Sequence, residues 1–283
     1  MTLANPIPRP MNRPLRRSTV RLALAALVLA GAPLAAEEMP ADIIHAEMRG
    51  GWRTEAGNQM AALHLTLAPG WKTYWRAPGD AGIPPRFDWA GSQNIASATI
   101  HWPRPDIFDI NGLRTIGYQG ELILPVEFTP QHRGAPMTVA GRVDLGVCED
   151  ICVPMVLDLA ADLPQSTRPD PAIRAALALV PGSATSAGMS AVHCSAEPIR
   201  DGLRLTTAIT IPRLGPDEFA VVEVADPSIW VSPTENHREG GQIVSVAELV
   251  PVDAQPFALD RSGVRVTLFG GSGQVVDLQG CTG

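Results

Sequence analysis

The chain has 283 residues, with 22 Lys or Arg, 29 Asp or Glu and four cysteines, and its formal net charge is −7. This acidic balance argues against a nucleic-acid partner. The length is sufficient for two modest domains.

Residues 1–36 have the pattern of an export signal. Residues 1–21 contain five arginines and no acidic residue. An apolar run from Leu22 to Ala36 follows them and ends in small residues. A run of about 15 residues is short for a membrane helix, which needs about 20, although an uncleaved anchor is the alternative. We therefore predict a signal peptide and a periplasmic protein. Cysteine pairs in that oxidising space are expected to form disulfides.

Residues 37–161 predict a β-sandwich. Short segments with alternating apolar residues, such as ELILPVEF and MTVAGRVDLGV, are separated by Gly and Pro. In MAALHLTL the leucines alternate with Ala62, His64 and Thr66, which is typical of a half-buried strand. Packing in the core or at its edge is the expected role of Trp71, Trp75, Trp89 and Trp102.

Residues 162–190 are rich in Pro, Ser, Gly and Ala and predict a linker. Asp170 can cap a short helix that starts at Pro171 and ends before Pro181. Residues 191–283 then resume the strand pattern and predict a second β-sandwich, so the expected fold class is all-β with two immunoglobulin-like domains. The glycine-rich FGGSGQ between the last two segments is interpreted as a hairpin turn, because no helix follows it.

Cys148 and Cys152 stand three residues apart in LGVCEDICVPM. If the flanking segments are antiparallel neighbours, EDI is a hairpin tip and the two cysteines face each other at its base. A disulfide there closes a loop of about five residues, which restricts the unfolded chain least and leaves the bond easily reduced. This spacing favours redox or metal chemistry over a structural role.

Cys194 and Cys281 lie in the first and last predicted segments of the second domain. A bond between them would enclose nearly the whole domain and stabilise it by at most about 4 to 5 kcal/mol. We predict that this disulfide is structural.

Three stretches of the first domain resemble a known family. They are GWKTYWRAPGDAGIPPRFDW (70–89), IHWPRPDIFDINGLRTIGYQGELILPVEF (100–128) and VDLGVCEDICVPM (143–155). Together they resemble the periplasmic N-terminal domain of the thiol:disulfide interchange protein DsbD and its ScsB-like relatives. The resemblance implies an immunoglobulin-like sandwich whose cysteine pair takes electrons from a membrane-embedded partner and passes them to thioredoxin-fold proteins. It also implies a cap loop that shields the pair.

The matching position for this cap is Ile107 to Arg114, whose tip Ile110-Asn111-Gly112 carries no aromatic side chain. Neither a membrane domain nor a thioredoxin-type C-x-x-C appears in the sequence. The electron donor is therefore expected on a separate chain, and the protein would be one component of a protein-disulfide reductase system. No cofactor is expected.

Three acidic residues are candidates for acid–base assistance: Glu149 and Asp150 between the cysteines, and Asp109 in the cap stretch. The charges beside the cysteines disfavour the thiolate but can assist proton transfer; they are equally explained as polar tip residues. Cys152 is expected to meet the partner, because Pro154 cannot donate a strand hydrogen bond and should interrupt the ladder there. Cys148 would be the buried, resolving thiol.

Two alternatives remain open from the sequence. A C-x3-C pair followed by Met155 also resembles the copper site of Sco-type proteins, with His64, His101 or His132 as a further ligand. The other alternative is a non-catalytic binding module.

Overall fold

Two β-sandwiches follow one another along the chain, so the predicted all-β fold class is confirmed. The computed structural model describes residues 43–110, 112–271 and 273–283. The predicted signal peptide lies outside these residues. No helix in the described part of the chain is long and apolar enough to cross a membrane.

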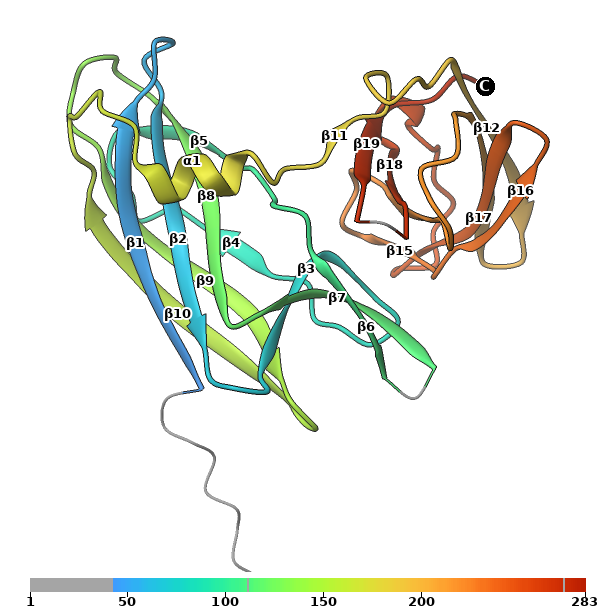
Figure 1. Cartoon of the computed structure of the whole chain (residues 1–283), viewed down its shortest axis with the longest axis horizontal. Coiled ribbons are helices and arrows are strands. Elements are labelled where there is room, and N and C mark those ends of the chain that lie inside the picture. Colours follow the sequence, from blue (N-terminus) through green and yellow to red (C-terminus); the bar gives the residue numbers. More distant parts are fainter. Residues whose placement is uncertain (1–42, 111, 272) are drawn as a thin grey trace, which may run out of the picture. The chain divides into compact units, whose positions relative to one another are not determined.

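The first sandwich has one sheet of order β1-β2-β8-β5 and a second of order β10-β9-β3-β7-β6, with β4 paired to β9 (Figure 1). Its strands are β1 (Ile44–Arg53), β2 (Gln59–Leu67), β3 (Lys72–Gly79), β4 (Arg86–Asp88), β5 (Ile95–Ile100), β6 (Asp106–Ile110), β7 (Leu113–Gln119), β8 (Glu121–Pro130), β9 (Thr138–Cys148) and β10 (Cys152–Asp162).

The core between these sheets follows from the alternation of side chains along each strand. Leu63 and Leu65 of β2 face Val143, Leu145 and Val147 of β9 within one buried cluster. The predicted role of the tryptophans is confirmed: three of the four are buried, and Trp89 is half-buried against the same cluster.

Helix α1 (Pro171–Leu177) starts as predicted. Asp170 caps it by accepting hydrogen bonds from the backbone N–H groups of Ala172 and Ile173. The helix ends earlier than predicted, with Ala178 as its C-cap. It lies across the outer face of the sheet that contains β2 and β8 (Figure 1), where Ile173 covers Ala62. For this reason Ala62 is fully buried, although the alternation of β2 placed it on the exposed face.

The second sandwich has sheets of order β11-β19-β18-β14 and β12-β13-β17-β15, with β16 paired to β17. The last two strands, which flank FGGSGQ, pair antiparallel as a hairpin requires, and Ser272 within this turn lies outside the described residues. Its elements are β11 (Gly182–Ser183), β12 (Ala191–Ile199), β13 (Gly202–Thr210), β14 (Phe219–Glu223), β15 (Ile229–Val231), β16 (Glu235–Glu239), β17 (Gln242–Pro251), the short 3-10 helix η1 (Arg261–Gly263), β18 (Arg265–Phe269) and β19 (Val275–Gln279).

Candidate functional site

The hairpin of β9 and β10 brings the C-x3-C cysteines together. The strands pair in register over their whole length, and Cys148 lies directly opposite Cys152. Their Cα atoms are 4.1 Å apart, and the two sulfurs are bonded. Residues 149–151 form the predicted three-residue tip.

The disulfide lies on the face of its sheet that points away from the core. Val143, Leu145 and Val147 occupy the core-facing positions of β9, so Cys148 occupies the opposite face. Cys148 is 3% exposed, whereas Cys152 is exposed. Because β10 is an edge strand, the exposed sulfur lies at an open side of the sheet.

The expected interruption of the ladder at Pro154 was wrong. Pro154 pairs with Gly146, and the register continues without a shift on both sides of it. Proline is tolerated here because an edge strand has one side whose N–H groups need no partner in the sheet. The open edge therefore results from strand order and not from a break in the strand.

Tyr74 of β3 is a further residue of the site that the sequence did not single out. Its hydroxyl oxygen lies 3.5 Å from Sγ of Cys152, and the hydroxyl is the donor because a disulfide sulfur carries no proton. Burial raises the pKa of this phenol, so the hydroxyl keeps its proton at neutral pH. A protonated hydroxyl in this position can donate a hydrogen bond to a thiolate on Cys152.

The loop of residues 80–85 packs over the same face. A Cβ atom at Gly146 would lie 2.8 Å from Cβ of Ile83, so only glycine allows this approach beside Cys148. A Cβ atom at Gly82 would lie 2.7 Å from the Tyr74 ring. The two glycines therefore let the loop lie against Tyr74 and the disulfide-bearing strand.

The stretch from Ile107 to Arg114, for which the resemblance implied a cap loop, is mostly a β-hairpin of β6 and β7. Asn111 at its tip lies outside the described residues. The aromatic side chain within residues 107–114 is Phe108, and Nζ of Lys72 lies 5.6 Å from its ring centroid. Lys72 is the backbone partner of Cys148 in the pairing of β3 with β9. Phe108 thus approaches the strand next to the disulfide, while the contact to the sulfur itself comes from Tyr74.

The three candidate acidic residues occupy different positions. Glu149 is exposed, and its carboxylate lies against Gly70, where a Cβ atom would come within 2.3 Å of Oε1. Asp150 is exposed at the tip. Asp109 accepts a hydrogen bond from the backbone N–H of Gly112 within its own hairpin. Among the described residues, no hydrogen bond or ion pair joins any of the three to a cysteine sulfur.

The arrangement separates the residues of the alternative copper site. Met155 packs against the core cluster, on the face of β10 opposite to Cys152. His64 contacts Glu47 and Glu121, and His101 contacts Glu127. No cluster of three or more His, Cys, Asp or Glu suited to a metal occurs in the residues that the structure describes.

The second disulfide joins Cys194 of β12 to Cys281 near the C-terminus, 87 positions apart. Cys194 is 1% exposed within the core of the second sandwich, and Cys281 is half-buried. The backbone N–H of Cys194 donates to the carbonyl of Thr282, so hydrogen bonds hold the two ends together as well.

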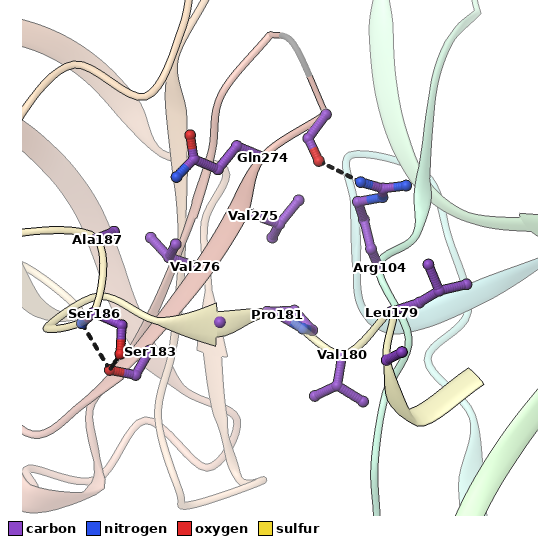
Figure 2. Close-up of a pocket in the computed structure, with 13 residues that line it drawn as sticks. Arg104, Leu179, Val180, Pro181, Ser183, Ser186, Ala187, Gln274, Val275 and Val276 are labelled. Carbon is purple, nitrogen blue, oxygen red and sulfur yellow. Dashed lines mark hydrogen bonds between the residues drawn. The ribbon is translucent and has the colours of Figure 1, made fainter. Parts of the chain in front are cut away.

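A pocket of about 350 Å³ lies beside the end of α1 and β11 (Figure 2). Among the described residues, its only charged lining side chain is Arg104, which donates from Nη1 to the carbonyl of Gly273 at 2.6 Å. No cysteine, histidine or acidic residue in the described part of the chain lines it. This pocket therefore offers no group for redox or acid–base chemistry.

Comparison with known proteins concerns the first sandwich and the overall fold. Residues 42–163 match the family described as "Thiol:disulfide interchange protein DsbD, N-terminal". The fold is similar to that in the crystal structure of the N-terminal periplasmic domain of ScsB from Proteus mirabilis, with a TM-score of 0.62 and 24% sequence identity over 87% of this chain and 96% of that one. No curated protein sequence shows significant similarity to the chain. Residues 42–163 thus form a DsbD N-terminal-like domain.

Proposed function

We propose that the protein is a periplasmic thiol:disulfide exchange module, in which Cys148 and Cys152 carry two electrons from a membrane partner to thioredoxin-fold proteins. The observation that carries the proposal is the asymmetric cysteine pair at the open sheet edge. Cys152 is exposed and Cys148 is 3% exposed directly opposite it. Exchange requires one reachable sulfur and a second close enough to resolve the intermediate, and this pair supplies both.

The proposed reaction begins with the reduced pair. The thiolate of Cys152 attacks one sulfur of the client disulfide, and the other client sulfur leaves as a thiolate and takes up a proton. Cys148 then loses its proton and attacks Sγ of Cys152, which releases the second client thiolate. The client disulfide gains two electrons and two protons, and the Cys148–Cys152 bond forms again. A dithiol on the membrane partner reverses these steps and restores the reduced pair.

The positions of Cys148 and Cys152 in the sheet support unequal roles for the two cysteines. An incoming group can approach Cys152 from solvent along the free side of β10, whereas Cys148 lies beside the Gly146 position that Ile83 covers. The exposed hydrophobic side chain Ile151, 74% exposed, stands next to Cys152 at the tip. It offers an apolar contact to a docking partner at the point of exchange.

A trapping experiment tests the proposal. Cys148→Ala leaves Cys152 without a resolving thiol, so we expect this variant to accumulate a mixed disulfide with a purified oxidised thioredoxin-fold protein. Cys152→Ala should accumulate little, because its remaining thiol is buried. Non-reducing gels followed by peptide mass spectrometry identify the bonded cysteine.

Reversed yields would exchange the roles of the two cysteines. If neither variant formed a mixed disulfide while the wild-type dithiol bound one Cu(I) per chain, the exchange function would be wrong and the copper alternative would replace it.

A further inference from the structure

The pairing of strand β3 with its sheet is interrupted by a bulge immediately after Tyr74, the residue that contacts the disulfide. Tyr74 still pairs with Gly117 of β7, but the next residue of β3 with a partner is Gly79, opposite Thr115. Strand β9 pairs with β3 only at Lys72 and Thr73. In the described residues, the stretch 75–78 therefore has no neighbour in the sheet to hold it.

The second sandwich supplies the missing contacts. Trp75 is fully buried, and its ring meets that of Phe269 edge to face at a centroid distance of 5.7 Å. Phe269 in turn stacks on Phe219 at 4.7 Å. Phe219 and Phe269 belong to the same buried cluster as the core of the first sandwich. The described residues of both sandwiches also fall within one compact unit.

Arg76 adds a polar clamp to this apolar contact. Its Nε donates to both carboxylate oxygens of Glu223, at 3.1 and 3.0 Å, and its Nη2 donates to Thr267 at 2.9 Å and to Asp277 at 3.2 and 3.3 Å. The guanidinium also lies 3.8 Å from the centroid of the Trp75 ring. The side chains of Arg76, Glu223 and Asp277 are 11%, 20% and 17% exposed. Charged hydrogen bonds this far removed from water restrict the guanidinium closely.

From this geometry we infer that the second sandwich positions the redox site of the first: Glu223 and Asp277 hold Arg76, and Arg76 holds Tyr74 against the sulfur of Cys152. Arg76 is thus a positioning residue two places from Tyr74, and it touches neither cysteine in the described contacts. The inference gives the second sandwich a task. It deepens the proposed exchange function and rests on it.

The reactivity of Cys152 measures this positioning directly. In a Cys148→Ala background with the Cys194–Cys281 bond intact, Cys152 is the only free thiol, and the pH profile of its alkylation by iodoacetamide reports how well its thiolate is stabilised. Tyr74→Phe removes the hydroxyl and should slow the alkylation of Cys152 at neutral pH by about fivefold. This factor corresponds to the net free energy that one hydrogen bond contributes. The midpoint of the profile should move to higher pH.

Arg76→Ala and Glu223→Gln should reproduce that shift, in whole or in part, with Tyr74 unchanged. Combining either with Tyr74→Phe should add nothing further, because all three changes remove the same contact. The matched control is Glu218→Gln, which disrupts another buried ion pair of the second sandwich, with Arg238. This control should leave the profile at its parental position. Arg76→Lys, which keeps the positive charge, should give a smaller shift than Arg76→Ala.

Three outcomes would overturn the inference. The first is an unchanged alkylation profile in both Glu223→Gln and Arg76→Lys while Tyr74→Phe shifts it. The second is no shift in Tyr74→Phe itself. The third is an equal shift in Glu218→Gln, which would show a general loss of stability. Circular dichroism checks that each variant is folded. If Arg76→Ala does not fold, the alkylation profile of Glu223→Gln tests the inference in its place. Iodoacetamide requires no protein partner, so a failed trapping experiment and a failed positioning inference remain distinguishable.

Discussion

Replacing both Cys194 and Cys281 with alanine is expected to lower the free energy of unfolding by about 2 to 5 kcal/mol. The bond joins residues 87 positions apart, and the loop-closure relation assigns about 4.6 kcal/mol to a loop of that size. Each kcal/mol corresponds to about 2 to 4 °C in Tm for a chain of this length. Urea unfolding followed by circular dichroism measures the change.

The matched control is the alanine double variant of Cys148 and Cys152. Their separation is only 4, and the same relation assigns about 2 kcal/mol to this bond. The variant without the Cys194–Cys281 bond should therefore lose roughly twice as much stability as the variant without the Cys148–Cys152 bond. In a protein that lacks the Cys194–Cys281 bond, Tyr74→Phe should still slow the alkylation of Cys152. Equal losses of stability in the two double variants would contradict the prediction, because they would show that the larger loop closed by Cys194–Cys281 adds no further stability.

Dithiothreitol is expected to reduce the Cys148–Cys152 bond at least about tenfold faster than the Cys194–Cys281 bond in the native protein. A reducing thiolate must reach a sulfur in line with the bond, and Cys152 is exposed. Cys194 is 1% exposed and Cys281 is half-buried, so the bond is less accessible to attack, and each 1.4 kcal/mol of free energy needed for local opening slows its reduction tenfold. Timed alkylation followed by peptide mass spectrometry measures the two rates.

Repeating the reduction in denaturant provides the control, because unfolding exposes both bonds and should remove most of the difference. Equal labelling of all four cysteines in the native protein would contradict the prediction.

Local patterns predicted those parts of the fold that depend on neighbouring residues. Alternation from Val139 to Val147, followed by a short polar tip, indicated the β9–β10 hairpin and the opposed cysteines. Asp170 before Pro171 indicated the start of α1. In each case the residues that decide the structure lie within a few positions of one another, so the sequence alone carries the information.

The missed parts depend on strand order. Tyr74 and Cys152 are 78 positions apart and meet because β9 lies between β3 and β10. The shared face of Tyr74 and Cys148 follows from Lys72 being paired with Cys148, which no local pattern reveals. The Arg76 clamp spans 147 positions to Glu223 and requires both sandwiches. A possible signal was the glycine-rich stretch containing Gly82, since such residues often mark a close approach of chain segments.

The placement of the Cys148–Cys152 bond on the outer face also bears on its reduction potential. Forming or breaking this bond repacks none of the core side chains, so the short loop that it closes is what favours the oxidised pair on folding, while a hydrogen bond from Tyr74 to the Cys152 thiolate favours the reduced pair. A disulfide that stabilises the folded protein has, by linkage, a lower reduction potential there than in the unfolded chain. The stabilisation of about 2 kcal/mol by the Cys148–Cys152 bond lowers the potential of this two-electron couple by about 45 mV. The stabilisation of about 4.6 kcal/mol by the Cys194–Cys281 bond lowers its potential by about 100 mV. A shift as small as the first lets modest differences in potential between partners drive electrons in either direction, as the proposed exchange function requires.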